Sequence, residues 1–224
     1  MNAPVKLDEE GTVIRFAHAS DNDGVDEFRG YELYYKFYTD DDDRLIVDQF
    51  QADDDFIRDS PRSPNPNRLR QRGYRRIRAR GATGTGAQPL LAGASGTVRY
   101  DVFFPYDSSV DNPLIGEDDA YALYHENGVP QPADSQRLAR GPNVDDDEGI
   151  AKPFFPFERE NDIDTGYSAN DADFGAGNDR FVTAIDANNP IEIAIYGLAF
   201  GRTTDFEVIY SVPAFLGRIE IFPQ

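Results

Sequence analysis

The sequence predicts an all-β fold, an antiparallel β-sandwich with a long, loop-rich central insertion. Residues 31–38 and 191–196 alternate from one residue to the next between two faces, and this period of two is typical of a strand with one buried face. The aromatic residues, 12% of the chain, are all Tyr or Phe and occur within such alternating runs, which favours sheet over helix. A chain of 224 residues is long enough to bury a substantial core.

The N-terminal part is predicted to contribute two strands. Residues 2–10 are polar and are expected to be loose, whereas residues 12–18 form a strand with Ile14 and Phe16 on its apolar face. After a turn-rich loop at 20–26, residues 31–38 form the strongest strand of this half. One face of that strand carries Tyr31, Leu33, Tyr35 and Phe37. The other face carries Glu32, Tyr34, Lys36 and Tyr38.

The middle of the chain is predicted to be mixed. Residues 45–57 read as a strand plus a short helix around Phe50, and the prolines within 60–67 forbid a helix there. Strands are expected at 73–80, at 97–104 and at 121–125, the last followed by an Asn127-Gly128 turn. The Gly-rich residues 81–96 are expected to be flexible. Residues 129–177 show little periodicity and are expected to be loop, and another strand follows at 181–185.

The C-terminal part is predicted to form an antiparallel hairpin. Ile191, Ile193 and Ile195 alternate with other residues, 201–205 supply turn chemistry, and the alternation restarts at 206–210. Pro213 ends the second strand or places it at a sheet edge, and a last short strand follows at 218–222. Because strands from both chain ends present matching apolar faces, one shared core is expected to hold Ile14, Phe16, Leu33, Ile193, Ile195 and Val208.

Both ends of the chain resemble a fibronectin type III sandwich of the immunoglobulin-like class. A strand and a polar loop followed by 30–36 resemble strands B and C, and 196–217 resemble strands F and G. The combination also resembles uncharacterised bacterial cell-envelope proteins, often lipoproteins. This resemblance implies an extracytoplasmic protein, either of the envelope or secreted. The chain has no cysteine, so a lipobox and its export signal would have to lie in a removed segment.

The domain prediction is a single β-sandwich over 1–224. Its strands at 11–40 and 180–222 complete each other around an insertion at about 41–179. The alternative divides the chain into domains at 1–105 and 106–224, because residues 74–80 also resemble a type III F strand that would close a first sandwich.

The charge balance limits the partners. The chain has 41 acidic and 22 basic residues and a formal net charge of -19, which repels nucleic acid and anionic membranes. No apolar run approaches the roughly 20 residues needed to span a bilayer, so no transmembrane segment is predicted. The partner that we expect is a glycan or an envelope protein.

An acidic loop at 161–179 is the candidate calcium site. Calcium prefers oxygen ligands on a turning backbone, and the loop is rich in Asp, Asn and Gly. The proposed ligands are Asp162, Asp164, Asp171 and Asp173. The alternative is a solvated acidic loop in a protein that is acidic throughout.

An arginine-rich segment at 62–80 is the candidate anion site. Arg75, Arg76 and Arg78 could hold a phosphate or a sulfated sugar. The alternative is internal pairing with the Asp runs. In addition, exposed tyrosines could stack on sugar rings, or could simply be packed across strands. These tyrosines are Tyr34, Tyr38, Tyr121 and Tyr124.

No catalytic motif is present. His18 and His125 are the only histidines, and neither belongs to a metalloprotease pattern. The sequence therefore predicts a non-enzymatic, extracytoplasmic binding or structural module. The alternative is a carbohydrate-active enzyme or a carbohydrate-binding accessory domain, which would use paired carboxylates in a cleft.

Overall fold

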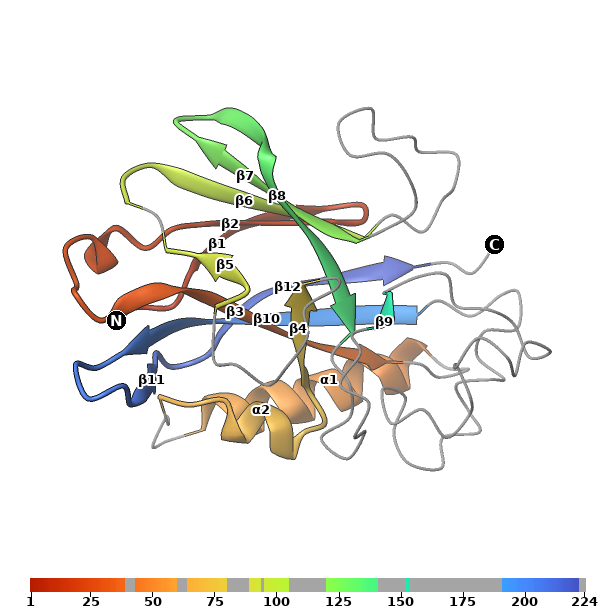
Figure 1. The fold of residues 1–224 in the computed structure, drawn as a ribbon. Coiled ribbons are helices and arrows are strands. Elements are labelled where there is room, and N and C mark those ends of the chain that lie inside the picture. The colour runs from red at the N-terminus through yellow and green to blue at the C-terminus, as the bar shows by residue number, and fades with distance from the viewer. Residues whose placement is uncertain are drawn as a thin grey trace.

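Figure 1 shows the fold in a computed structural model. The structure describes residues 1–38, 43–59, 64–79, 89–93, 95–104, 120–140, 152–153 and 191–221. The helical elements in these residues are η1 (Ser20–Asn22), α1 (Asp43–Arg58) and α2 (Asn67–Gln71). The strands are β1 (Val5–Glu10), β2 (Val13–Ala17), β3 (Phe28–Tyr38), β4 (Arg75–Ala79), β5 (Leu91–Ala92), β6 (Val98–Phe103), β7 (Tyr121–Glu126), β8 (Val129–Arg140), β9 (Lys152–Pro153), β10 (Ile191–Arg202), β11 (Val208–Tyr210) and β12 (Ala214–Ile221).

The described strands join in one curled antiparallel sheet, which confirms the all-β prediction. Its main path runs β1-β2-β6-β7-β8-β4-β3-β10-β11, with β12 also paired to β10. The path curls because β12 lies against β1 and β2, from the opposite end of the order. In Figure 1 the long strand β8 crosses from the half with β6 and β7 to the half with β3, β4 and β10. The helices α1 and α2 lie below that second half.

The space inside the curl is filled by one apolar core. Of the residues predicted to share a core, all but Val208 do so. Val208 is 38% exposed, so this part of the prediction is wrong. The reason is its position on β11, whose pairing within the described part of the chain is limited to the last residues of β10, from Phe200 to Arg202. The predicted apolar face of the strand at 97–104 is confirmed, because Val98, Tyr100, Val102 and Phe104 all belong to the core.

Strands β3 and β10 join the two chain ends. They pair over their whole shared length, with Tyr35 opposite Ile195 and Leu33 opposite Gly197. The predicted hairpin after β10 is confirmed by the pairing of β10 with β11. However, Phe206 lies in its turn rather than in a strand, with a φ of 64° and 78% of its surface exposed. The number of domains stays a prediction, because 105–119, 141–151 and 154–190 lie outside the described residues.

The second face of β3 is not exposed, contrary to what the alternation suggests. Tyr34 and Tyr38 are at most 1% exposed and belong to a second apolar cluster. That cluster is closed by α1, which spans the segment predicted to be a strand plus a short helix. Ile46, Phe50 and Ile57 recur at helical spacing and so face the sheet together.

Polar side chains fasten α1 to the sheet. Asp53 accepts a hydrogen bond from the Tyr38 hydroxyl at 2.8 Å and pairs with Lys36 at 2.5 Å. Its neighbour Asp54 accepts a hydrogen bond from the buried Tyr196 hydroxyl on β10. Burial raises the pKa of both tyrosines above the ordinary value, so their hydroxyls remain donors.

Two further sequence predictions are corrected by the structure. Residues 5–10, expected to be loose, form the exposed strand β1 on β2, where backbone pairing needs no apolar face. Residues 129–140, expected to be loop, form β8 between β7 and β4. Their prolines are tolerated near a register irregularity in the pairing with β7. The strand predicted at 121–125 and its turn are confirmed, with φ of 50° at Asn127 and 80° at Gly128.

Gly30 provides a test of the close approach between β3 and β5. Its φ is 146°, and an added Cβ would lie 2.0 Å from the Leu91 carbonyl oxygen. Gly30→Ala is therefore expected to lower the free energy of unfolding by about 2–4 kcal/mol, measured by urea denaturation.

Gly11→Ala is the matched control, because Gly11 also has a positive φ, 56°, but has no atom within 4 Å of an added Cβ. It should cost only the backbone strain, about 1 kcal/mol. Equal losses for the two variants would contradict the packing of β5 on β3.

Candidate functional site

Two surface grooves are the candidate binding sites in the described part of the chain. The first, which we call the hairpin groove, lies between α2 and β11 and has a volume of about 330 Å³. The second, the loop groove, lies where the loop before β3 meets β5 and the β6–β7 end, with a volume of about 660 Å³. Both fall near the usual size range of small-ligand sites, about 300–1,000 Å³.

The hairpin groove is built from two short elements held on the sheet. Pro66 precedes the first residue of α2, and the Asn65 side chain accepts the Asn67 backbone N–H at 2.9 Å. Leu69 is fully buried in the second apolar cluster and so fixes α2 against the sheet. The other wall is β11, which contributes Val208, Ile209 and Tyr210.

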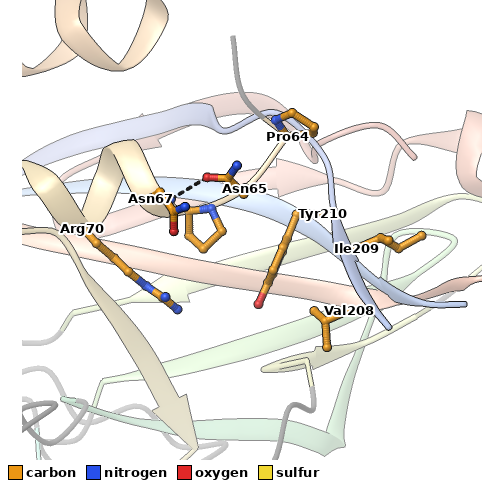
Figure 2. A pocket seen from close by; sticks show the side chains of 8 residues that line it. Pro64, Asn65, Asn67, Arg70, Val208, Ile209 and Tyr210 are labelled. Carbon is orange, nitrogen blue, oxygen red and sulfur yellow. Dashed lines mark hydrogen bonds between the residues drawn. The ribbon is translucent and has the colours of Figure 1, made fainter. Parts of the chain in front are cut away.

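Arg70 and Tyr210 provide the hairpin groove with a positive charge and a hydroxyl hydrogen-bond donor. Figure 2 shows both side chains projecting into the space between α2 and β11. Burial raises the pKa of Tyr210, and the nearby negative charge of Glu32 adds to this. The Tyr210 hydroxyl therefore stays protonated and can donate a hydrogen bond to a ligand.

A buried ion pair lies close to this groove. Glu32 on β3 is completely buried, pairs with Arg76 at 2.9 Å and accepts the Tyr34 hydroxyl at 2.9 Å. Burial raises the pKa of the Glu32 carboxyl, and the positive charges of Arg76 and Arg70 act in the opposite direction. The negative charge of the Glu32 carboxylate also raises the pKa of Tyr210, which lines the groove.

Most arginines of the 62–80 segment that the structure describes have partners in the chain. Arg68 donates to the carbonyl oxygens of Phe56 and Asp59, at 2.6 and 2.9 Å. Arg72 lies over the Phe56 ring, 4.1 Å from its centroid, and is 3.7 Å from Asp53. The predicted anion-binding residues Arg75, Arg76 and Arg78 also have interactions within the chain, so that binding role stays a prediction.

Arg70 differs from these arginines. It is exposed, and its side chain forms no hydrogen bond or ion pair with any residue that the structure describes. Sequence reasoning did not single it out, because the run of arginines gives no sign of which side chain faces a groove. Pro66 could have signalled the start of a short helix. Recognising that helix would have placed Arg70 on α2, apart from Arg75, Arg76 and Arg78 on the following strand.

The loop groove is shaped by a buried histidine. His18 contacts the Asp23 carboxylate through Nε2 at 2.9 Å and the Tyr31 hydroxyl through Nδ1 at 2.8 Å. Asp23 also lies 3.3 Å from the Gly96 backbone nitrogen, whose N–H donates to it. These contacts hold the loop before β3 against the chain that precedes β6. The Asp23 carboxylate is thus occupied in positioning two segments.

The loop groove combines aromatic and polar side chains. Tyr124 and Phe28 contribute rings, and Arg29, Ser95 and Glu126 contribute polar groups. Of the tyrosines predicted to stack on sugars, Tyr34 and Tyr38 are buried under α1, so the prediction is wrong for them. Tyr121 is also buried and stacks on Phe103 at 4.6 Å. Tyr124 is the member of that set that lines a groove.

The second histidine lies in a charged cluster on another face. His125 Nε2 is 3.1 Å from an oxygen of Asp101, and Arg99 pairs with the same carboxylate at 3.0 Å. Burial lowers the pKa of His125, with Asp101 opposing this shift and Arg99 adding to it. The cluster lines neither groove, and we assign it to sheet packing.

The predicted calcium ligands lie outside the described residues, so the calcium site stays a prediction. These residues are Asp162, Asp164, Asp171 and Asp173. Within the described ranges, no group of three or more His, Asp or Glu side chains is arranged to hold a metal ion. The described helices also include none that is long and apolar enough to cross a membrane.

Comparisons of this chain with protein-family models, with curated proteins and with solved structures gave no match. The candidate sites therefore rest on the geometry of the chain itself.

The buried Glu32 carboxyl predicts a pH dependence of stability. Because folding raises its pKa, its contribution to stability is fully present below the unfolded value of about 4.3 and is lost as the pH rises through the folded value. The free energy of unfolding of the protein, relative to that of Glu32→Gln, should therefore fall between acid and neutral pH. Urea denaturation of both proteins over this range measures it, and an increase toward neutral pH would contradict the account.

Proposed function

We propose that this protein is a non-enzymatic, extracytoplasmic binding module that holds a glycan of the cell envelope in the loop groove. The observation that carries the proposal is the lining of that groove, where the rings of Tyr124 and Phe28 stand beside Arg29, Ser95 and Glu126. Sugar rings present apolar faces, which pack on aromatic side chains, and hydroxyls, which need hydrogen-bond partners. The groove offers both kinds of group.

The finer fold assignment belongs to the same proposal. We propose that the curled sheet is an elaborated immunoglobulin or fibronectin type III-like sandwich, supported by the resemblance of 30–36 and 196–217 to type III strands. The pairing of β3 with β10 agrees with that resemblance. The extracytoplasmic location rests on the likeness to envelope proteins and on the acidic surface, which favours a neutral or cationic partner.

A carbohydrate-active enzyme is the second candidate, because two carboxylates, Asp23 and Glu126, line the same groove. Glycosidases use such a pair at a separation of about 5–5.5 Å or about 6.5–9.5 Å. We favour the binding module because Asp23 is already occupied by His18 and by the Gly96 N–H. A carboxylate held in this way fixes the loop and is poorly placed to act as an acid or a nucleophile.

Retention on polysaccharides tests the proposed function. The protein is applied in affinity electrophoresis to gels containing soluble xylan, laminarin or peptidoglycan fragments. Retardation by one of these gels is expected, and Tyr124→Ala should weaken it by about tenfold because a stacking surface is lost. Tyr124→Phe should keep most of the binding.

Tyr210→Ala, in the hairpin groove, is the matched control and should leave retention unchanged. Absence of retardation in all three gels, or equal retardation of the Tyr124→Ala variant, would rule out the loop groove as a glycan site. Release of reducing ends that Asp23→Asn or Glu126→Gln abolishes would instead establish the enzyme.

A further inference from the structure

We propose that the hairpin groove is a second binding site, which takes a small oxyanion group, a carboxylate, sulfate or phosphate, on the guanidinium of Arg70. The proposal does not depend on the glycan function, because it concerns a different groove that shares no lining residue with the loop groove. It also differs from the sequence prediction, which placed the anion on Arg75, Arg76 and Arg78.

The first argument is that the Arg70 charge has no protein counter-ion among the described residues. Arg68 donates to two backbone carbonyls, Arg72 pairs with Asp53, and Arg76 pairs with Glu32. The positive charge of Arg70 lowers the pKa of the Glu32 carboxyl from a distance, but the two side chains form no ion pair. The net charge of -19 disfavours anions over most of the surface, so an arginine without a carboxylate partner is a local exception at which an external anion can bind.

The second argument is the local excess of positive charge. The positive charges of Arg70 and Arg76 both lower the pKa of the buried Glu32 carboxyl, so two cations lie near this one anion. The pKa of Arg78 is lowered, first by burial and then by the positive charge of Arg76. Arg70 therefore adds positive charge beside an arginine–glutamate pair that is already formed, and a bound anion would offset that charge.

The third argument is the arrangement of the groove around Arg70. Asn67 and Tyr210 carry side-chain donors and line the same groove as the guanidinium, as Figure 2 shows. Val208, Ile209 and Pro66 supply apolar walls, which reduce competition from water and strengthen charged hydrogen bonds. A guanidinium with neighbouring N–H and O–H donors suits planar carboxylates and tetrahedral oxyanions.

An NMR titration of the whole protein tests this site. Sodium acetate, sodium sulfate, inorganic phosphate and glucuronate are added in separate arms at constant ionic strength, with sodium chloride as the reference. The readout is the side-chain amide signals of Asn65 and Asn67, which report on the groove even when Arg70 is absent. At least one oxyanion is expected to give saturable shifts, whereas chloride is not. The arms separate the carboxylate, sulfate and phosphate sources.

Arg70→Gln is expected to weaken this affinity at least about tenfold, since a charge-assisted hydrogen bond is lost, and Arg70→Lys should lose less. Lys6→Gln, which removes a surface cation that lines neither groove and pairs with Glu9, should bind as the unchanged protein does. Thermal unfolding confirms that the variants are folded. Non-saturating shifts in every arm, or equal affinity in Arg70→Gln, would overturn the proposal, and neither result depends on retention by polysaccharides.

Discussion

The pairing of β3 with β10 is the interaction on which the rest of this structure depends. Both strands are buried on both faces, so each contributes side chains to the core inside the curled sheet and to the second apolar cluster under α1. The inner faces, with Tyr35 opposite Ile195, help to fill the curled sheet. The outer faces, with Tyr34 opposite Tyr196, form the floor on which α1 packs. Losing this pairing would expose both apolar clusters, and the long sequence separation of the strands makes it costly to form.

The layer between α1 and the sheet, which is the second apolar cluster, buries apolar surface and also provides hydrogen-bond partners for buried hydroxyls. Tyrosine rings fill the space under α1, and each buried hydroxyl then needs a partner. Asp53 and Asp54 meet that need from the helix. The same layer also creates the hairpin groove, because α2 follows α1 on this face and β11 extends from the end of β10. The loop groove forms separately, where the His18 contacts hold the loop before β3.

Alternation in the sequence was enough to predict strands β3, β6 and β10, because each has a complete apolar face. It failed where tertiary structure decides exposure: the second face of β3 looks like a solvent face until α1 covers it. The helix itself was partly missed because Asp53 and Asp54, which look like surface residues, point inward to tyrosines. The exposed strand β1 has no apolar pattern to detect. The sequence could identify the arginine segment but not Arg70 within it, because the tertiary structure decides which arginine side chains find partners in the chain and which one faces a groove.

Native-state hydrogen exchange of the backbone amides tests the central role of the β3–β10 pair most directly. If this pair organises the fold, its amides exchange only through global unfolding, with an exchange free energy equal to that from urea denaturation. The amides of the exposed edge strand β1 should exchange with a lower free energy. The account would be contradicted if amides of β3 and β10 exchanged as readily as those of β1 while other strands stayed protected.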